Sequence, residues 1–417
     1  MNWQPQEIPR PESPLITQLN LQATWLSAYS IVYVAERAYT AKLNAQEALS
    51  AAAKKQLETD RIYLRLIGWL YVFALRHNCW SQLSLWVKSC NNDMATLVDL
   101  GRFLLVAYLR LFRKYKGRTP SHSSHPSRSS FDRRREALET QIVPIPTNHS
   151  EAKRRALERD NEQCLFTKRF SDQSALYLPT TSLATKQAIL DAASAFPRGV
   201  TREVMETDPF AVVDLIECTH ILSASTNQDI DAQLYKRAWA ASVWSILESF
   251  GHPEIHQELA GDHAHRLENV LSLTHAMHDR FDRMVIWLEP LMRKRSSSCS
   301  AFASLAEQGD NRYRANGAVQ YESVFLREVY STDGIIEFTT PDATVYPLPS
   351  QQYIELHAAA CKVAHMSGAA GLFDEFERAL DEDGVLAEDG SQMYILEHRL
   401  LQAGELDHSR CPRDLYL

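Results

Sequence analysis

Imidazole and carboxylate side chains gather in the segment THAMHDRFDRM, whose composition favours a helix. His275, His278 and Asp282 are spaced by three and four residues, so a helix would place them on one face. Nitrogen and carboxylate oxygen donors on one face can bind a divalent ion. The alternative is that His275 and Asp282 are solvated while Met277 and Phe281 pack inward.

A second chemically competent group precedes this helix. His220 ends the β-rich run VVDLIECTH, and Asn269 lies in the short strand-like segment ENVLSL. A neutral imidazole can take a proton from water near neutral pH, which is the work of a general base. Taken singly, His220 could equally be a satisfied histidine at a strand end, and Asn269 a turn-forming amide.

The order of these motifs resembles a known family. The chain carries RD-x3-C, then THIL, then ENVLSL, then H-x-x-FD, and this succession is similar to the fungal HNH endonuclease-like proteins, whose module is of the ββα-metal type. The similarity includes SRSSFDRRRE before the module and LPSQQYIELHAAACKVAHMSGAA after it. It covers roughly residues 97–390, while the first ninety residues match only as generic helices.

The resemblance implies roles for individual residues. His220 would be the general base, Asn269 would position that base or the fold of its loop, and His278 would be a metal ligand. Asp282 and His275 are further candidate ligands on the same helix face. The implied cofactor is a divalent metal, Mg²⁺ or Mn²⁺, and the implied reaction is metal-dependent hydrolysis of nucleic-acid phosphodiesters.

The chain departs from the family pattern beside the general base. Where the family usually has an acidic or imidazole metal ligand, this sequence has Thr219, and a hydroxyl is a poor substitute. The sequence therefore predicts a weakly bound metal. It also leaves open an alternative function, a nuclease-like scaffold without nuclease activity that acts in binding or in small-molecule acid-base chemistry with His220 as the base.

Basic residues flank the module in the sequence and are candidate phosphate contacts. The candidates are Arg133, Arg134, Arg135, Lys153, Arg154 and Arg155. Acidic residues are interleaved with them and dilute their charge, so a solvated helix end plus a charged linker is the stronger interpretation. The net charge of −8 argues against a generic polyanion binder, so any nucleic-acid contact must be local.

Composition narrows the class of protein. A hydrophobic content of 45% over 417 residues is enough to bury a core, which excludes a disordered chain. The seven cysteines include no CxxC pair, which fits an intracellular protein, cytoplasmic or nuclear. The run LIGWLYVFAL is too short to span a bilayer, so the sequence predicts a buried helix there and no membrane span.

The sequence predicts an α+β protein in four parts. Residues 1–118 form a helical region, 119–135 a flexible linker rich in Ser, Pro, His and Arg, 136–295 the HNH-like module with helical elaborations, and 296–417 a C-terminal strand and helix element packing on the module. In this last part, YESVFLREVY and GIIEFTT suit strands, while three helices are expected in PLPSQQYIELHAAACKVAHM, GLFDEFERALDEDG and MYILEHRLLQAG.

Overall fold

The computed structural model describes residues 3–45, 49–113, 129–142, 150–171, 213–226, 236–291, 311–318 and 334–381. Over these ranges the protein is mostly helical, with small β-sheets, and its class is α+β. The helices are α1 (Pro14–Thr17), α2 (Ala23–Asn44), α3 (Ala51–Phe73), α4 (His77–Ser89), α5 (Met94–Ala107), η1 (Leu109–Phe112), α6 (Ser129–Glu139), α7 (Ser150–Arg159), η4 (Ala224–Thr226), α11 (Lys236–Ser249), α12 (Ile255–Glu258), η5 (Gly261–His265), η6 (Leu267–Asn269), α13 (His275–Asp282), α15 (Gln351–Ser367) and α16 (Ala369–Asp381).

The strands form three separate small sheets. Their bounds are β1 (Phe170–Ser171), β2 (Val213–Asp214), β3 (Ile216–His220), β4 (Val270–Thr274), β5 (Ile286–Pro290), β6 (Arg312–Gly317) and β7 (Ile335–Glu337). β1 pairs with β2 in parallel, β3 with β4 antiparallel, and β5, β6 and β7 form an antiparallel sheet in that order. The strand predicted in GIIEFTT is confirmed as β7. YESVFLREVY and MYILEHRLLQAG lie outside the described residues.

Two of the N-terminal helices, α3 and α5, begin at capping side chains. Ser50 accepts a hydrogen bond from the Ala53 amide at the start of α3, and Asp93 accepts one from the Thr96 amide at the start of α5. The buried helix predicted in LIGWLYVFAL is confirmed over residues 66–72, in the second half of α3, while Ala74 follows the helix and Leu75 is exposed. Within the described part of the chain, no helix has the length and apolar character needed to cross a membrane.

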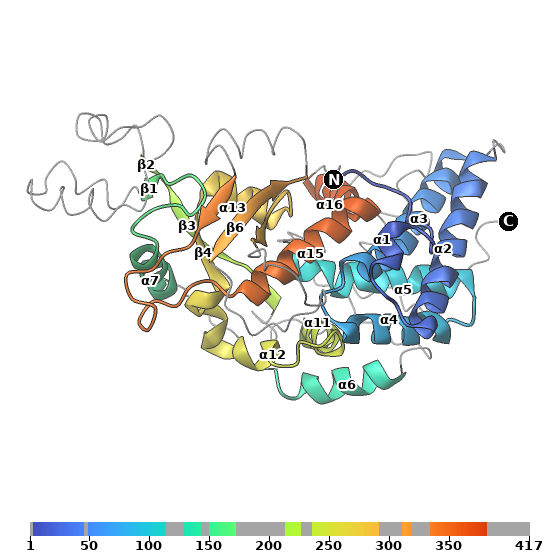
Figure 1. Ribbon diagram of the computed structural model, residues 1–417, viewed down its shortest axis with the longest axis horizontal. Coiled ribbons are helices and arrows are strands. Elements are labelled where there is room, and N and C mark those ends of the chain that lie inside the picture. Colours follow the sequence, from blue (N-terminus) through green and yellow to red (C-terminus); the bar gives the residue numbers. More distant parts are fainter. Residues whose placement is uncertain are drawn as a thin grey trace, which may run out of the picture.

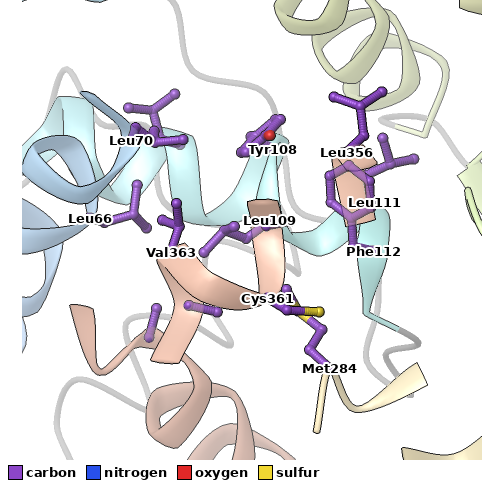
Figure 2. Close-up of a cluster of buried hydrophobic side chains, with 14 of the residues drawn as sticks. Leu66, Leu70, Tyr108, Leu109, Leu111, Phe112, Met284, Leu356, Cys361 and Val363 are labelled. Atoms are coloured by element: carbon purple, nitrogen blue, oxygen red, sulfur yellow. The ribbon is translucent and has the colours of Figure 1, made fainter. Parts of the chain in front are cut away.

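Helix α15 joins the N-terminal helices to the rest of the fold. It packs against α3 and β5, and Figure 1 shows it between α3 and β6. The helix predicted in PLPSQQYIELHAAACKVAHM is confirmed. Figure 2 shows Leu356, Cys361 and Val363 of α15 among buried side chains of α3 and η1. The same apolar cluster runs from Ile8 to Phe376, so the predicted helical region and the segments around β3 and β4 share one core.

The structure differs from the sequence prediction in the second half of the expected linker. Residues 119–128 lie outside the described residues, but Ser129–Glu139 form helix α6. The reason is Phe131, which is 2% exposed and packs edge-on against Trp86 and Phe103. An aromatic ring buried in this way contributes enough apolar burial to order a short segment that composition alone assigned to a linker.

Candidate functional site

Strands β3 and β4 and helix α13 surround the predicted site, and η4, α11, α12, η5 and η6 lie between the two strands in the sequence. In the antiparallel register Ile216 pairs with Thr274 and His220 with Val270. α13 begins at His275, directly after β4. Asn269 is not on the strand, as the sequence suggested, but is the last residue of η6, immediately before β4.

The pleat divides the side chains of β3 between two faces. Glu217 and Thr219 point to one face, and Cys218 and His220 point to the other, because successive strand residues alternate. On the Cys218 face, α7 contributes Ala152 and Ala156 to a small apolar cluster. Glu217 bonds to side chains of α13, so α13 lies on the other face. The structure therefore places His220 and His278 on opposite faces of β3.

His220 bonds to a second histidine. Its Nε2 atom lies 2.9 Å from Nδ1 of His265 in η5, and the ring centroids are 5.1 Å apart at 62°. Both residues are half-buried. A hydrogen bond between two ring nitrogens requires one to donate and the other to accept, which links the proton positions of the two rings.

Asn269 fixes the backbone around both histidines. Its side chain is fully buried, and its Oδ1 atom accepts a hydrogen bond from the Leu222 amide at 2.9 Å. Its Nδ2 atom donates to the carbonyls of Leu222 at 3.0 Å and Ala264 at 2.9 Å. Leu222 lies two residues after His220, and Ala264 immediately precedes His265. A single amide thus ties together the two segments that carry the imidazole pair.

On the opposite face of β3, His278 lies between two carboxylates. Its Nδ1 atom makes a very short hydrogen bond to Oε2 of Glu217, and its Nε2 atom lies 3.0 Å from Oδ2 of Asp282. His275 Nδ1 lies 3.0 Å from Oε1 of Glu217. Burial opposes ionisation of Glu217, but the hydrogen bonds from His278 and His275 outweigh it and lower the pKa of this carboxyl.

The last turn of α13 is held by helix α15. The ring of His357 stacks on Phe281 with centroids 3.8 Å apart and planes at 3°. Burial lowers the pKa of His357 to about 4, so this imidazole is neutral at pH 7 and serves as packing. The stacked pair anchors the buried side of α13, and Asp282 follows it at the end of the helix.

The residues around His278 are the candidate ligands for a divalent ion. The donor chemistry, an imidazole with two carboxylates, suits such an ion. In the part of the chain that the structure describes, however, no group of three or more His, Cys, Asp or Glu side chains is arranged to hold a metal. The two carboxylates occupy opposite ring nitrogens of His278 instead of pointing to a common centre. As placed, these residues do not fit the implied metal.

Thr219 adds no ligand in this arrangement. Its side chain is fully buried on the same strand face as Glu217, and its Oγ1 atom has no hydrogen-bond partner among the described residues. A buried hydroxyl without a partner is costly, and this one marks the position at which the resemblance implies a charged or imidazole ligand.

Residues of the RD-x3-C motif have a structural role. Arg159, fully buried at the end of α7, binds both carboxylate oxygens of Asp160 and donates to the carbonyls of Leu267 at 2.7 Å and Val270 at 2.9 Å. The Cys164 sulfur accepts from the Thr274 amide at 3.3 Å. These contacts hold α7 and the following turn against β4, and they bring no chemistry of their own.

Most of the predicted phosphate contacts are engaged within the protein. Arg154 pairs with Glu151 and Glu158, and Arg155 donates to the Val345 carbonyl at 2.6 Å. Arg134 lies 3.8 Å from Glu248 and hydrogen-bonds Ser249, while Arg133 is exposed and Lys153 half-buried.

Arg135 is placed differently from the exposed position that a phosphate contact needs. Arg135 is only 5% exposed, so its guanidinium does not face solvent as a phosphate contact would. It lies on the inner side of α6, which packs against α11.

Sequence reasoning missed two residues of the site. Glu217 could have been found, because it lies two positions before Thr219 and must share its strand face. His265 carried no such signal: the run DHAH is typical of a loop, and its contact with His220 depends on the tertiary fold. No family model, curated protein or solved structure matches the chain, so its function is argued from this geometry.

Proposed function

We propose that this protein hydrolyses nucleic-acid phosphodiesters through an HNH-like site in which His220 is the general base. The observation that carries the proposal is the placement of a half-buried imidazole at the end of β3, in a hydrogen bond with His265 and beside a turn fixed by Asn269. The succession of β3, β4 and α13 supports it, since this is the order of elements that the resemblance implies.

In the proposed step a proton moves from water to His220, and one bond to phosphorus replaces another. A ring nitrogen of neutral His220 takes a proton from a water molecule, whose oxygen forms a new bond to phosphorus. The bond from phosphorus to the leaving oxygen breaks, and its electron pair stays on that oxygen, which then takes a proton from solvent. His265 and the Asn269-held backbone keep the base in place.

A second candidate is a nuclease-like scaffold without nuclease activity, which binds a partner or performs small-molecule acid-base chemistry with His220. Two observations favour it. The described residues offer no ready metal site, and His220 and His278 lie on opposite faces of β3. In addition, most of the basic residues expected to bind phosphate are engaged inside the protein.

A cleavage assay with matched variants separates the two candidates. The full chain is incubated with supercoiled plasmid, single-stranded DNA and RNA, in EDTA and in millimolar Mg²⁺ or Mn²⁺. Wild type should cleave at least one substrate, and His220→Ala should lose about 10²- to 10⁴-fold in rate, the usual contribution of a general base. His263→Ala is the control, because His263 is an exposed imidazole of the same short helix as His265.

The outcomes are distinct. Equal melting temperatures of wild type and His220→Ala, with activity lost only in the latter, support the nuclease. Cleavage that is unchanged in His220→Ala removes His220 from the mechanism. Folded wild-type protein that cleaves none of the substrates under any of these conditions favours the scaffold.

A further inference from the structure

We infer that His265 is a positioning residue for His220, holding it in the tautomer in which Nε2 carries the proton and Nδ1 the basic lone pair. This inference deepens the proposed function. It depends on one contact, the 2.9 Å separation of His220 Nε2 and His265 Nδ1. A neutral imidazole has one donor and one acceptor nitrogen, so fixing the first nitrogen as a donor assigns the second.

The direction of this hydrogen bond decides whether His220 can act. If His220 donates from Nε2, its Nδ1 atom holds the lone pair that takes the proton from water. When Nδ1 takes that proton, the imidazolium continues to donate from Nε2 to His265, and a charged donor makes a stronger hydrogen bond than a neutral one. If His265 donated instead, the basic nitrogen of His220 would be occupied by the bond. The pair therefore favours the reaction in one tautomer only.

The surrounding backbone shows that the pair is built into the fold. Asn269, fully buried, binds Leu222 and Ala264 through one side chain, and Ile221 donates its amide to the Asn269 carbonyl at 2.8 Å. Ala224 and Ala264 pack together beside these bonds. Both imidazoles thus project from segments whose separation is set by the same buried amide, which is how a catalytic base is held by rigid neighbours.

The inference is tested by a spectroscopic readout that needs no nuclease activity. Full-length protein with ¹⁵N-labelled histidine is studied by long-range ¹H–¹⁵N correlation, and the His220 signals are identified by their loss in His220→Gln. In wild type they should show a single fixed tautomer with the proton on Nε2. In His265→Ala they should shift toward the averaged values of exchanging tautomers.

Two further variants make the test specific. In His265→Asn the side-chain oxygen stands where Nδ1 stood, so it can still accept the hydrogen bond and should restore the fixed tautomer. His263→Ala should leave the His220 signals unchanged. In the cleavage assay, His265→Ala should lower kcat by roughly 10- to 100-fold at unchanged KM, as loss of an outer partner does, and His265→Asn should recover most of it.

Failure of this inference is distinguishable from failure of the proposed function. A fixed Nδ1–H tautomer in wild type, or a His220 signal unaffected by His265→Ala, overturns the positioning role even if the protein is a nuclease. A fixed Nε2–H tautomer that His265→Ala abolishes and His265→Asn restores supports it, even if none of the nucleic acids is cleaved.

Discussion

The two faces of β3 hold histidines in opposite electrostatic surroundings. On one face His220 meets a second imidazole and a backbone fixed by a neutral amide. On the other, His278 lies between the carboxylates of Glu217 and Asp282. An imidazole bonded to a second imidazole stays available as a base more readily than one between two carboxylates, which favour its protonated form. The comparison therefore favours His220 over His278 as the base of the proposed reaction.

The comparison also explains why the carboxylate face is not a ready metal site. A divalent ion needs several donors around one centre, but here Glu217 and Asp282 are each engaged by a ring nitrogen of His278, and Glu217 also by His275. Binding an ion would require His278 to release a carboxylate. This face of β3 also carries Thr219 where the resemblance implies a charged or imidazole ligand.

The largest effect is expected from placing a charge on this face with Thr219→Asp. Thr219 is fully buried and shares its strand face with Glu217, so an aspartate there is a buried, uncompensated anion near another carboxylate. We expect it to lower the free energy of unfolding by about 3–5 kcal/mol in EDTA, measured by urea denaturation. The added carboxylate also supplies a third acidic donor, so millimolar Mn²⁺ should restore part of the loss.

Calorimetric titration checks the same variant. Wild type should show little heat with Mg²⁺ or Mn²⁺ at micromolar protein, and Thr219→Asp should bind detectably more tightly. Thr219→Asn is the control, because it is close in size to aspartate but adds no charge. Tight binding by wild type, or no cation dependence in Thr219→Asp, would show that the metal position has been placed wrongly.

A smaller loss is expected on the other face from Asn269→Ala. This change removes three buried side-chain hydrogen bonds and leaves the Leu222 amide and the Ala264 carbonyl without them. We expect about 2–4 kcal/mol of destabilisation by urea denaturation, since each orphaned buried group costs about 1–3 kcal/mol. Asn316→Ala, which removes one long, exposed hydrogen bond, should change stability by under about 0.5 kcal/mol.

A second measurement on Asn269→Ala connects stability to the imidazole pair. If the amide sets the separation of the two segments, the His220 signals should lose their fixed tautomer in this variant, under conditions where it is still folded. Retention of the wild-type signals would mean that the pair forms without Asn269.

The features that the sequence predicted depend on local patterns, whereas those it missed depend on contacts between distant segments. The order of β3, β4 and α13, the buried run in α3 and the helix α15 follow from local patterns of apolar residues and turn signals, and these survive in the fold. The pairing of Glu217 with His278 was within reach of the same reasoning, because it needs only strand alternation and a helix on that face.

The remaining contacts depend on segments that are distant in the sequence. His220 and His265 meet only because Asn269 joins the backbone at Leu222 to that at Ala264. Phe131 orders α6 only because Trp86 is there to receive it. No local propensity encodes such contacts, which is why the expected linker extended too far and why the contact between His220 and His265 of η5 was not foreseen.

The smallest effect, and one confined to acid, is expected from Glu217→Gln. Hydrogen bonds from His278 and His275 hold the pKa of Glu217 below its ordinary value of 4.5, against the opposing effect of burial. A carboxyl whose pKa is lowered in the folded state contributes stability that is fully present above its unfolded pKa and is lost as the pH falls through its folded pKa.

The free energy of unfolding of wild type should therefore exceed that of Glu217→Gln by up to about 1 kcal/mol near pH 6, a modest value because Glu217 is partly exposed. The difference should shrink as the pH falls below 4.5 and vanish once the pH is below the folded pKa of Glu217, where the carboxyl is protonated. The control is Glu12→Gln, an exposed position whose stability should follow wild type across this range. Urea denaturation at a series of pH values measures all three proteins. A difference between wild type and Glu217→Gln that persists unchanged into acid would show that Glu217 acts by packing or by neutral hydrogen bonds, and the charged contrast between the two faces of β3 would then be wrong.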